Sequence, residues 1–540
     1  MMMNYPLTLT NLLKRGTTLF PQKEIVSREL DGTIVRLNYG EFYRRTAQLA
    51  NALRELGITK NKRVGTLAWN THRHLELYFA VPCMGATYHT VNIRLSPKDI
   101  IFIINHAEDE ILFIDGDLLP LLEAIKNQIQ VKTFVVMGNQ KKYNTTLSLI
   151  NYEDLIAKQP ENYDWPELDE WDIAGMAYTS GTTGEPKGVQ YTHRALVLHS
   201  IVAGLPDIMN ISESTVMLHI VPMFHANAWS IPFATVMTGS KQVFTGPRAT
   251  PEDMIGLIER EKVTFTAAVP VIFRMLYEYL KANPGKDIST WKNSVCGGSA
   301  PPPSLVKAFK EDFDMEIYHA YGLTETTPLI TWNVPKSYMK LDDQAFYDLK
   351  TKQGLLVPLL EMRIEKSDGS EAKWNGEEMG ELLVKGPWIA KEYYKDPDET
   401  FRKMTKGWFR TGDIVTIDKE GYIKIVDRIK DVIKTGGEWI SSVDLENEIM
   451  AHPAVLEATV IGLPHPKWDE RPLACVVLRP GMKGKVSEKD IVDFITPKFA
   501  KWWLPDKVIF IDEIPKTSVG KFDKKVLRAQ FENLYQKDQE

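Results

Sequence analysis

The stretch Tyr178-Thr179-Ser180-Gly181-Thr182-Thr183-Gly184-Glu185-Pro186-Lys187-Gly188 decides the interpretation of this chain. Its glycines let consecutive backbone N–H groups turn toward one anion, and its hydroxyls and lysine add further donors. The spacing differs from that of a Walker A loop, because Pro186 precedes Lys187 and Gly188 follows it. A polar surface turn is the alternative for such a stretch. The density of donors favours a phosphate-binding loop.

The chain on either side of this loop alternates short strands with helices. The apolar run Gly175–Tyr178 just before it is typical of the end of a buried strand. We expect helices over Glu41–Ile58, Leu75–Met84, Leu118–Asn127 and His193–Ala203, and strands over Arg63–Trp69, Ile111–Ile114 and Thr133–Met137. This alternation predicts an α/β fold with doubly wound parallel sheets.

The pattern changes in the last third of the chain. After Gly354 we expect a small β-rich subdomain with strands over Met362–Ile364, Glu381–Lys385, Ile414–Ile417 and Tyr422–Val426. The final segment predicts a compact α+β module, with helices over Leu445–Met450 and Glu488–Phe499 and strands over Val455–Gly462, Ala474–Leu478 and Lys507–Ile511. A run of alternating charge that starts at Asp427 is a plausible hinge between the two parts. We therefore expect a large N-terminal domain over residues 1–426 and a mobile C-terminal domain over residues 427–540.

Length and composition limit the class of protein. A chain of 540 residues is too long for one core, so two or more domains are expected. Hydrophobic content of 44% and charged content of 25% are typical of a soluble globular protein. A net charge of −6 argues against nucleic acid as the main partner. Cys83, Cys296 and Cys475 are too widely spaced for a disulfide framework or a structural zinc site, which fits a reducing cytoplasm.

We expect neither a targeting signal nor a membrane-spanning segment. Residues Met1–Leu13 lack the basic and apolar regions of a signal peptide, and Lys537–Glu540 carries no peroxisomal or lipidation tag. The most apolar long window, Val221–Thr238, contains His225, Asn227 and two prolines, which is typical of a buried functional segment. The sequence therefore predicts a cytoplasmic protein.

Further motifs follow the loop along the chain. They are VPMFHANAW (221–229), VCGGSAP (295–301), YGLTE (321–325), TGD (411–413) and PKTSVGK (515–521). Paired glycines admit a flat ligand, a tyrosine face can stack on adenine, and carboxylates can hold Mg²⁺ or accept ribose hydroxyls. Taken alone, His225 and Trp229 are more typical of core structure, and Lys521 of the surface. Asp413 alone fits a turn as well as a ribose site.

In this order the motifs resemble those of the adenylate-forming family, which includes acyl-CoA synthetases, firefly luciferase and peptide-synthetase adenylation domains. The resemblance covers the chain from about residue 20 to about residue 530. The segments VPMFHANAW and KTGGEWISSVDLEN (434–447) are most similar to bacterial medium- and long-chain fatty-acyl-CoA synthetases. Glu185 departs from the family pattern, because many relatives carry an apolar or small residue there.

The resemblance implies a role for each motif. Thr179 and Glu325 would hold Mg²⁺. Lys521, His225 and Glu325 would be catalytic. Trp229 would gate the acyl tunnel, and Asp427 would be the hinge. ATP and coenzyme A would be bound by Thr179, Ser180, Gly181, Thr182, Thr183, Gly184, Lys187, Gly298, Tyr321, Gly322, Thr324, Asp413, Arg428, Lys430, Lys434 and Trp439.

The implied activity is an ATP-dependent acid–thiol ligase that forms acyl-AMP and then acyl-CoA. The partners would be small molecules (fatty acid, ATP and coenzyme A), with a homodimer left open. A luciferase-like oxidoreductase would add oxygen chemistry, and the acyl-gating segment argues against it. A non-catalytic relative would be expected to lack Lys521, Glu325 or Asp413, and a peptide-synthetase domain would normally precede a carrier domain. A ligase with another acyl or aryl substrate range stays open.

Overall fold

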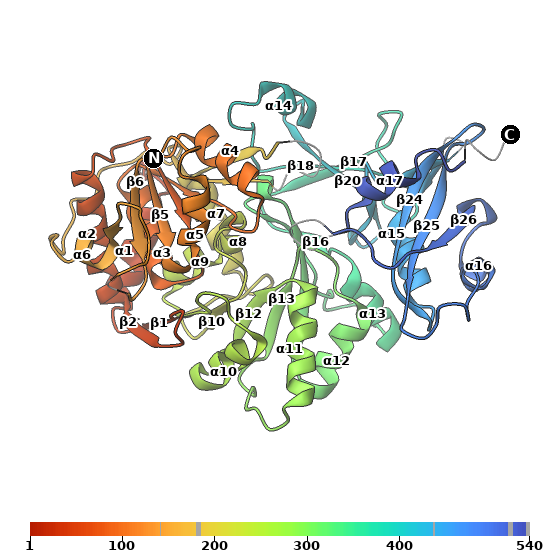
Figure 1. Cartoon of the computed structure of the whole chain (residues 1–540), viewed down its shortest axis with the longest axis horizontal. Coiled ribbons are helices and arrows are strands. Elements are labelled where there is room, and N and C mark those ends of the chain that lie inside the picture. The colour runs from red at the N-terminus through yellow and green to blue at the C-terminus, as the bar shows by residue number, and fades with distance from the viewer. Residues whose placement is uncertain (141, 180–184, 436–437, 517–521, 536–540) are drawn as a thin grey trace. The chain divides into compact units, whose positions relative to one another are not determined.

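The computed structural model describes residues 1–140, 142–179, 185–435, 438–516 and 522–535 (Figure 1). The chain forms two compact units. The first comprises Met1–Glu361 with Val384–Phe409, and the second Met362–Leu383 with Arg410–Glu540. Within the described residues, no helix is both long and apolar enough to cross a membrane.

A seven-stranded sheet organises the N-terminal part of the first unit. Its order is β7-β6-β5-β3-β4-β8-β9, and all neighbours are parallel except β8 and β9. The strands are β3 (Arg63–Leu67), β4 (Thr87–Thr90), β5 (Ile111–Asp115), β6 (Thr133–Met137), β7 (Ile150–Asn151), β8 (Ile173–Tyr178) and β9 (Gly188–Thr192). The loop predicted to bind phosphate connects the last two strands, so it lies in an antiparallel hairpin at one edge of this sheet.

A nine-stranded sheet forms the rest of this unit, in the order β16-β15-β14-β13-β12-β10-β11-β1-β2. Its strands are β1 (Glu24–Arg28), β2 (Ile34–Asn38), β10 (Val216–His219), β11 (Lys241–Phe244), β12 (Phe265–Ala268), β13 (Asn293–Cys296), β14 (Glu316–Gly322), β15 (Leu329–Trp332) and β16 (Leu355–Leu356). The central strands are parallel, and β2, β15 and β16 are antiparallel additions at the two ends.

Helices cover both sheets of the first unit. They are α1 (Leu9–Leu19), α2 (Tyr39–Glu55), α3 (His72–Cys83), α4 (Pro97–Ala107), α5 (Leu119–Ile125), α6 (Tyr152–Ile156), α7 (His193–Ala203), α8 (Ala226–Trp229), α9 (Ile231–Thr238), α10 (Pro251–Glu261), α11 (Pro270–Ala282), α12 (Pro303–Phe313), α13 (Asp343–Thr351) and α14 (Pro397–Lys403), with 3-10 turns η1 (Gly116–Leu118) and η2 (Thr324–Thr326). Helices α10, α11 and α12 lie beside β10, β12 and β13 (Figure 1). Buried residues of these helices and strands share one core. Buried residues of α4 and α5 pack on β5 and β6 in the same way.

The second unit carries most of a five-stranded sheet and all of another. The first has the order β17-β18-β20-β19, with β21 also paired to β20, and comprises β17 (Glu361–Glu365), β18 (Gly380–Lys385), β19 (Met404–Thr405), β20 (Trp408–Ile417) and β21 (Ile423–Arg428). The other has the order β23-β22-β25-β24, with β26 paired to β25, and comprises β22 (Ile433–Thr435), β23 (Glu438–Ile440), β24 (Val455–His465), β25 (Asp469–Leu478) and β26 (Lys507–Phe510).

Both faces of the β24–β25 hairpin are buried. Ala458 and Val460 lie in a core with α15 (Ser442–Met450) and α16 (Glu488–Ile495). Ile461 and Leu463 lie in another core with α17 (Lys524–Phe531). Because successive strand residues point to opposite faces, one hairpin supplies both cores. The 3-10 turns η3 (Thr496–Lys498) and η4 (Lys501–Trp503) follow α16.

The predicted α/β class, with a large N-terminal part and a smaller C-terminal part, is confirmed. Strand β6 and helix α7 have the predicted bounds. The helix predicted over Glu488–Phe499 is wrong at its end: α16 stops at Ile495, because Pro497 cannot continue the helical hydrogen bonds. The strand predicted to reach Trp69 stops at Leu67, and Thr71 then caps a helix three residues earlier than predicted. The domain boundary predicted between residues 426 and 427 lies within β21 and stays a prediction.

Candidate active site

Backbone hydrogen bonds join β8 to β9 where the predicted phosphate loop leaves one strand and enters the other. Tyr178 pairs with Gly188 in the ladder. The Thr179 N–H donates to the Lys187 carbonyl at 2.9 Å, and the Lys187 N–H donates to Thr179 Oγ1 at 3.3 Å. These bonds fix the two ends of the loop against each other. Ser180, Gly181, Thr182, Thr183 and Gly184 lie outside the described residues.

Lys187 has an acidic and an aromatic neighbour. Its Nζ lies 2.5 Å from Glu399 Oε1 and 5.7 Å from the centre of the Tyr393 ring. Arg402 Nη2 contacts the other oxygen of Glu399 at 2.8 Å. The lysine predicted to bind phosphate is therefore held by residues that the sequence analysis did not single out.

The turn that carries Thr324 and Glu325 follows β14. A Cβ added to Gly322 would lie 1.8 Å from the Pro328 carbonyl oxygen, so only glycine fits at this position. The Tyr191 hydroxyl donates to the Thr324 carbonyl at 2.9 Å, which joins the turn to β9. The turn is thus fixed beside the strand that begins just after Lys187.

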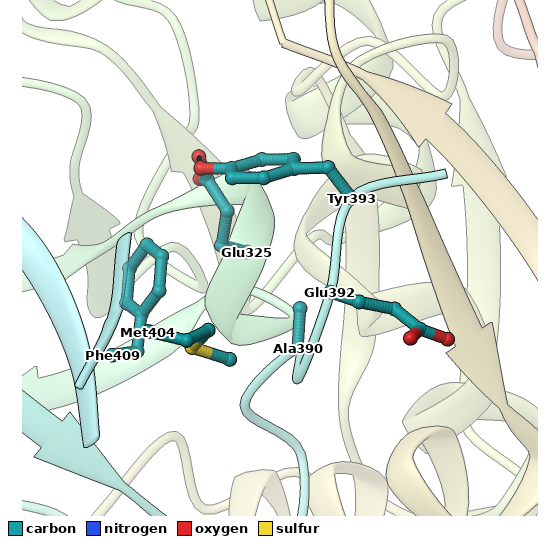
Figure 2. A pocket seen from close by; sticks show the side chains of 6 residues that line it. All are labelled: Glu325, Ala390, Glu392, Tyr393, Met404 and Phe409. Atoms are coloured by element: carbon teal, nitrogen blue, oxygen red, sulfur yellow. Dashed lines mark hydrogen bonds between the residues drawn. The ribbon is translucent and has the colours of Figure 1, made fainter. Parts of the chain in front are cut away.

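Glu325 is held through its backbone and its side chain. Its carbonyl accepts the Ala390 N–H at 2.7 Å, and its Oε1 accepts the Tyr393 hydroxyl at 2.6 Å. A small pocket at this point is lined by Glu325, Ala390, Glu392, Tyr393, Met404 and Phe409 (Figure 2). Figure 2 shows the Tyr393 hydroxyl meeting the Glu325 carboxylate, while the Glu392 carboxylate points away. Lys187 and Glu325 therefore both lie against Tyr393, one by the ring and one by the hydroxyl.

The segment that contains His225 and Trp229 is anchored by the stretch after β3. The Asn70 amide donates to the carbonyls of His219 and Val221, and its oxygen accepts the Met223 N–H. His225 itself is exposed and precedes α8. Its neighbours Phe224 and Ala226 are buried.

An unexpected backbone conformation follows His225. Residues Ala226 to Ser230 all have positive φ, between 42° and 57°. For residues with a Cβ the left-handed conformation costs roughly 1–2 kcal/mol each, so tertiary contacts must hold this turn. One such contact is the Ser230 hydroxyl, which donates to the Thr327 carbonyl at 2.9 Å. No glycine stands among these five residues, and Asn227 is the one residue type in the turn that favours a left-handed conformation.

Trp229 packs on the loop predicted to border adenine. The indole is 9% exposed, and a Cβ added to Gly297 would lie 2.9 Å from its Cη2. Gly298, the next residue, has a φ of +78° and lies against Val269. The predicted acyl gate and the predicted adenine loop are therefore in direct contact. Tyr321, the other predicted adenine neighbour, is 8% exposed.

In the second unit, Asp413 and Arg428 face each other across β20 and β21. Arg428 Nε lies 2.6 Å from Asp413 Oδ1, and the Asp413 side chain is only 1% exposed against 44% for Arg428. The Asp413 N–H donates to Thr411 Oγ1 at 3.1 Å. The two residues predicted to bind ribose thus form a pair with a buried carboxylate and an exposed guanidinium.

Asp427, the predicted hinge, is also buried. Its Oδ1 accepts the Arg428 N–H and its Oδ2 the Ser442 N–H, each at 2.7 Å. Lys524 contacts Ser442 Oγ at 2.6 Å and Glu446 at 2.7 Å. Burial raises the pKa of Asp427 to about 6, against the opposing effect of Lys524. Asp427 therefore supports the first turn of α15, and Lys524 is a contact that the sequence analysis missed.

Three further predicted residues of the second unit, Lys430, Lys434 and Trp439, lie in the β22–β23 hairpin or just before it. Lys430 lies in an exposed turn after β21. Lys434 pairs with Trp439 in the ladder, and its N–H donates to Glu470. Trp439 is half-buried against Ile414 and its neighbours. Lys521 lies outside the described residues.

Comparison with known proteins supplies an independent line of argument. A model of the family described as AMP-binding enzyme matches residues 13–394, and a model of its C-terminal domain matches residues 444–521. A long-chain-fatty-acid–CoA ligase of Thermus thermophilus is 47% identical and covers 99% of this chain and 97% of its own length. A medium-chain-fatty-acid–CoA ligase of Ectopseudomonas oleovorans is 38% identical, over 99% of this chain and 97% of that protein. The crystal structure of an anthranilate CoA ligase with anthranoyl-AMP matches with a TM-score of 0.83 at 26% identity, over 98% of each chain.

Proposed function

Because the chain belongs to the AMP-binding enzyme family, we propose that it activates a medium- or long-chain fatty acid with ATP and passes the acyl group to coenzyme A. In the first step a carboxylate oxygen attacks the α-phosphorus and the bond to pyrophosphate breaks, which gives acyl-AMP. In the second step the coenzyme A sulfur attacks the acyl carbonyl, the bond to AMP breaks, and the thiol proton is released. Catalysis of the first step is mainly positioning and charge stabilisation.

The observation that carries this proposal is the meeting of Lys187 and Glu325 on Tyr393. An ammonium and a carboxylate at the base of a glycine-rich hairpin suit a phosphate chain with a divalent cation. The Thr179 hydroxyl and the Glu325 carboxylate are oxygen donors of the kind that Mg²⁺ prefers. They would hold the ion, which when bound neutralises charge on the phosphates. Lys187 would bind phosphate oxygens directly.

The family resemblance implies nucleotide contacts for residues of each unit. In the first, Gly298 and Tyr321 would border adenine, and Thr324 would bond a phosphate. In the second, the buried Asp413 carboxylate can only accept hydrogen bonds, which suits ribose hydroxyls, and Arg428 would lie beside it. Lys521 would neutralise charge on the reacting oxygens, and Lys430, Lys434 and Trp439 would take part in cofactor binding. Asp427 stays the proposed pivot.

The acyl side of the site would be formed by His225 and Trp229. His225 is exposed, which suits a contact with the fatty-acid carboxylate. The Trp229 indole packs on Gly297, so a nucleotide bound at the adjacent Gly298 could shift it. That contact supports a gate that opens to the acyl chain when ATP binds. A homodimer and a cytoplasmic location stay predictions.

A panel of acids tests the proposal. Release of AMP with coenzyme A is measured for saturated acids from C2 to C18, together with anthranilate. We expect an aliphatic acid of medium or long chain to give the highest kcat/KM. Anthranilate is included because an anthranilate ligase shares the fold, and it stands for an aryl-acid ligase as the second candidate. An aryl or amino acid with the highest kcat/KM would overturn the fatty-acid assignment.

A further inference from the structure

The segment Tyr393–Thr400 lies against both charged residues of the proposed phosphate site. Its ends are joined, because the Tyr393 N–H donates to Thr400 Oγ1 at 2.9 Å and that hydroxyl donates to the Asp396 carbonyl at 2.7 Å. It is also fixed to β9, because the Tyr394 N–H donates to the Gly188 carbonyl at 2.8 Å. The segment is therefore closed on itself and attached to the residue that follows Lys187.

The Tyr393 hydroxyl is a hydrogen-bond donor that matches the Glu325 carboxylate. An ionised carboxylate only accepts, and the phenol donates at 2.6 Å to one oxygen. A phenol carries its proton at neutral pH, so the hydroxyl is the donor in this bond. This bond fixes the rotation of the Glu325 carboxylate and leaves its Oε2 for another ligand.

Glu399 orients the Lys187 ammonium, as Tyr393 orients the Glu325 carboxylate. The ammonium has three donors, and the contact with Glu399 Oε1 occupies one of them. The Glu399 side chain is 11% exposed and also contacts Arg402, so its position is well defined. A lysine side chain is otherwise flexible, and an anchor for one N–H directs the other two. One closed segment thus orients a carboxylate and an ammonium at the same place.

We propose that Tyr393 and Glu399 are positioning residues for the magnesium–nucleotide site, with Tyr393 orienting Glu325 and Glu399 orienting Lys187. The inference rests on the proposed function for the nucleotide, and it is independent of which acid the enzyme activates. Neither residue touches the reacting atoms. Their effect is to place the two groups before magnesium and ATP bind, which lowers the cost of ordering them.

The first test measures ATP binding by calorimetry at a series of Mg²⁺ concentrations. Tyr393→Phe removes only the hydroxyl. We expect the Mg²⁺ concentration for half-maximal ATP affinity to rise about tenfold, the size typical of a lost hydrogen bond to a charged group. Tyr394→Phe is the matched control, because that hydroxyl contacts Glu108 instead, at 3.4 Å. It should leave the Mg²⁺ dependence unchanged.

A double-mutant cycle distinguishes a positioning role of Tyr393 from a general effect of its substitution on the structure. If Tyr393 acts through Glu325, then adding Tyr393→Phe to Glu325→Gln should change the Mg²⁺ dependence less than twofold. A tenfold change in both backgrounds would overturn the proposal, as would no change in the single variant. Should Tyr393→Phe fail to fold, Thr400→Val removes the acceptor of the Tyr393 N–H. It should shift the Mg²⁺ dependence in the same direction by a smaller factor, and no shift would overturn the proposal.

The second test addresses Glu399. Glu399→Gln should raise the KM for ATP by about three- to tenfold with a smaller change in kcat, because Lys187 loses its anchor. Glu392→Gln is the control, since that carboxylate points away from the site in Figure 2. A lower KM for ATP in Glu399→Gln would mean that Glu399 competes with phosphate, and would overturn its positioning role. Failure of the acid panel would not affect these measurements, because they follow ATP and Mg²⁺.

Discussion

The contact between Trp229 and Gly297 makes a quantitative prediction about the proposed gate. A Cβ at position 297 would lie 2.9 Å from the indole Cη2 and 3.2 Å from the Ala320 carbonyl oxygen. Carbon atoms in contact are normally about 3.5–4.0 Å apart, so in Gly297→Ala the indole must move by roughly 0.5–1 Å. Overpacking of this kind costs about 1–3 kcal/mol of unfolding free energy.

Removing the indole tests whether the cost of Gly297→Ala comes from the contact with Trp229. Trp229→Ala alone should cost about 3–5 kcal/mol if the indole serves only as core. In that background Gly297→Ala should cost less than about 1 kcal/mol, because only the clash with the Ala320 carbonyl remains. Urea unfolding followed by circular dichroism measures all four proteins without depending on tryptophan fluorescence. An unchanged cost of Gly297→Ala in the two backgrounds would refute the contact.

The same variants test gating. If Trp229 closes the acyl tunnel, Trp229→Ala should bind fatty acid without ATP, and added ATP should no longer raise that affinity. Gly297→Ala should show a partial effect in the same direction, because it displaces the indole without removing it. Large destabilisation with normal dependence on ATP would leave Trp229 as a core residue only.

Three further predictions concern other parts of the chain. Lys521→Ala should lower the rate of acyl-AMP formation by about 10²–10³ and spare thioester formation from supplied acyl-AMP; equal loss of both half-reactions would contradict its role. Burial raises the pKa of Asp427 from 3.8 to about 6, so the folded protein keeps a proton that the unfolded chain releases. The free energy of unfolding should therefore fall as pH rises from about 4 to about 6. In Asp427→Asn the free energy of unfolding should depend less on pH over this range. Urea unfolding at each pH measures both proteins. Asn70→Ala removes three buried hydrogen bonds and should cost about 2–4 kcal/mol in urea unfolding. Asn105→Ala removes two solvent-exposed hydrogen bonds and should cost less than half of that.

Elements with strong local signals were predictable from the sequence. The β-branched run of β6 and the helix α7, which Thr192 caps, have the predicted bounds. The end of α16 was predictable in principle, because Pro497 disfavours helix at the residue before it. The hairpin position of the phosphate loop was not predicted, although the reversal between β8 and β9 fits its glycine content.

The contacts that orient the site were not predictable. Tyr393 reaches Glu325 across 68 residues of sequence, and no local pattern marks that meeting. The segment containing Glu399 is typical of a surface helix start with Asp396 as its cap. Its relation to Lys187 depends on how the chain after Val384 returns to β9, which is a tertiary property. The motif residues were found because they recur in a family, and their supporting residues carry no such signature.

The left-handed turn from Ala226 to Ser230 has a consequence for how the chain folds. Of the five residues only Asn227 is of a type that adopts this conformation readily, and the two local hydrogen bonds, from the Ala228 and Ser230 N–H groups, are few for a turn of five left-handed residues, so distant contacts must help to hold it. Asn70, about 150 residues earlier, holds the stretch just before the turn through His219, Val221 and Met223. Thr327, 97 residues later, accepts the Ser230 hydroxyl of the turn itself. Closing such distant contacts is slow, and we expect this segment to acquire its shape after the two sheets have formed. Pulse-labelling hydrogen exchange during refolding should then show the amides of 226–230 protected later than those of β10.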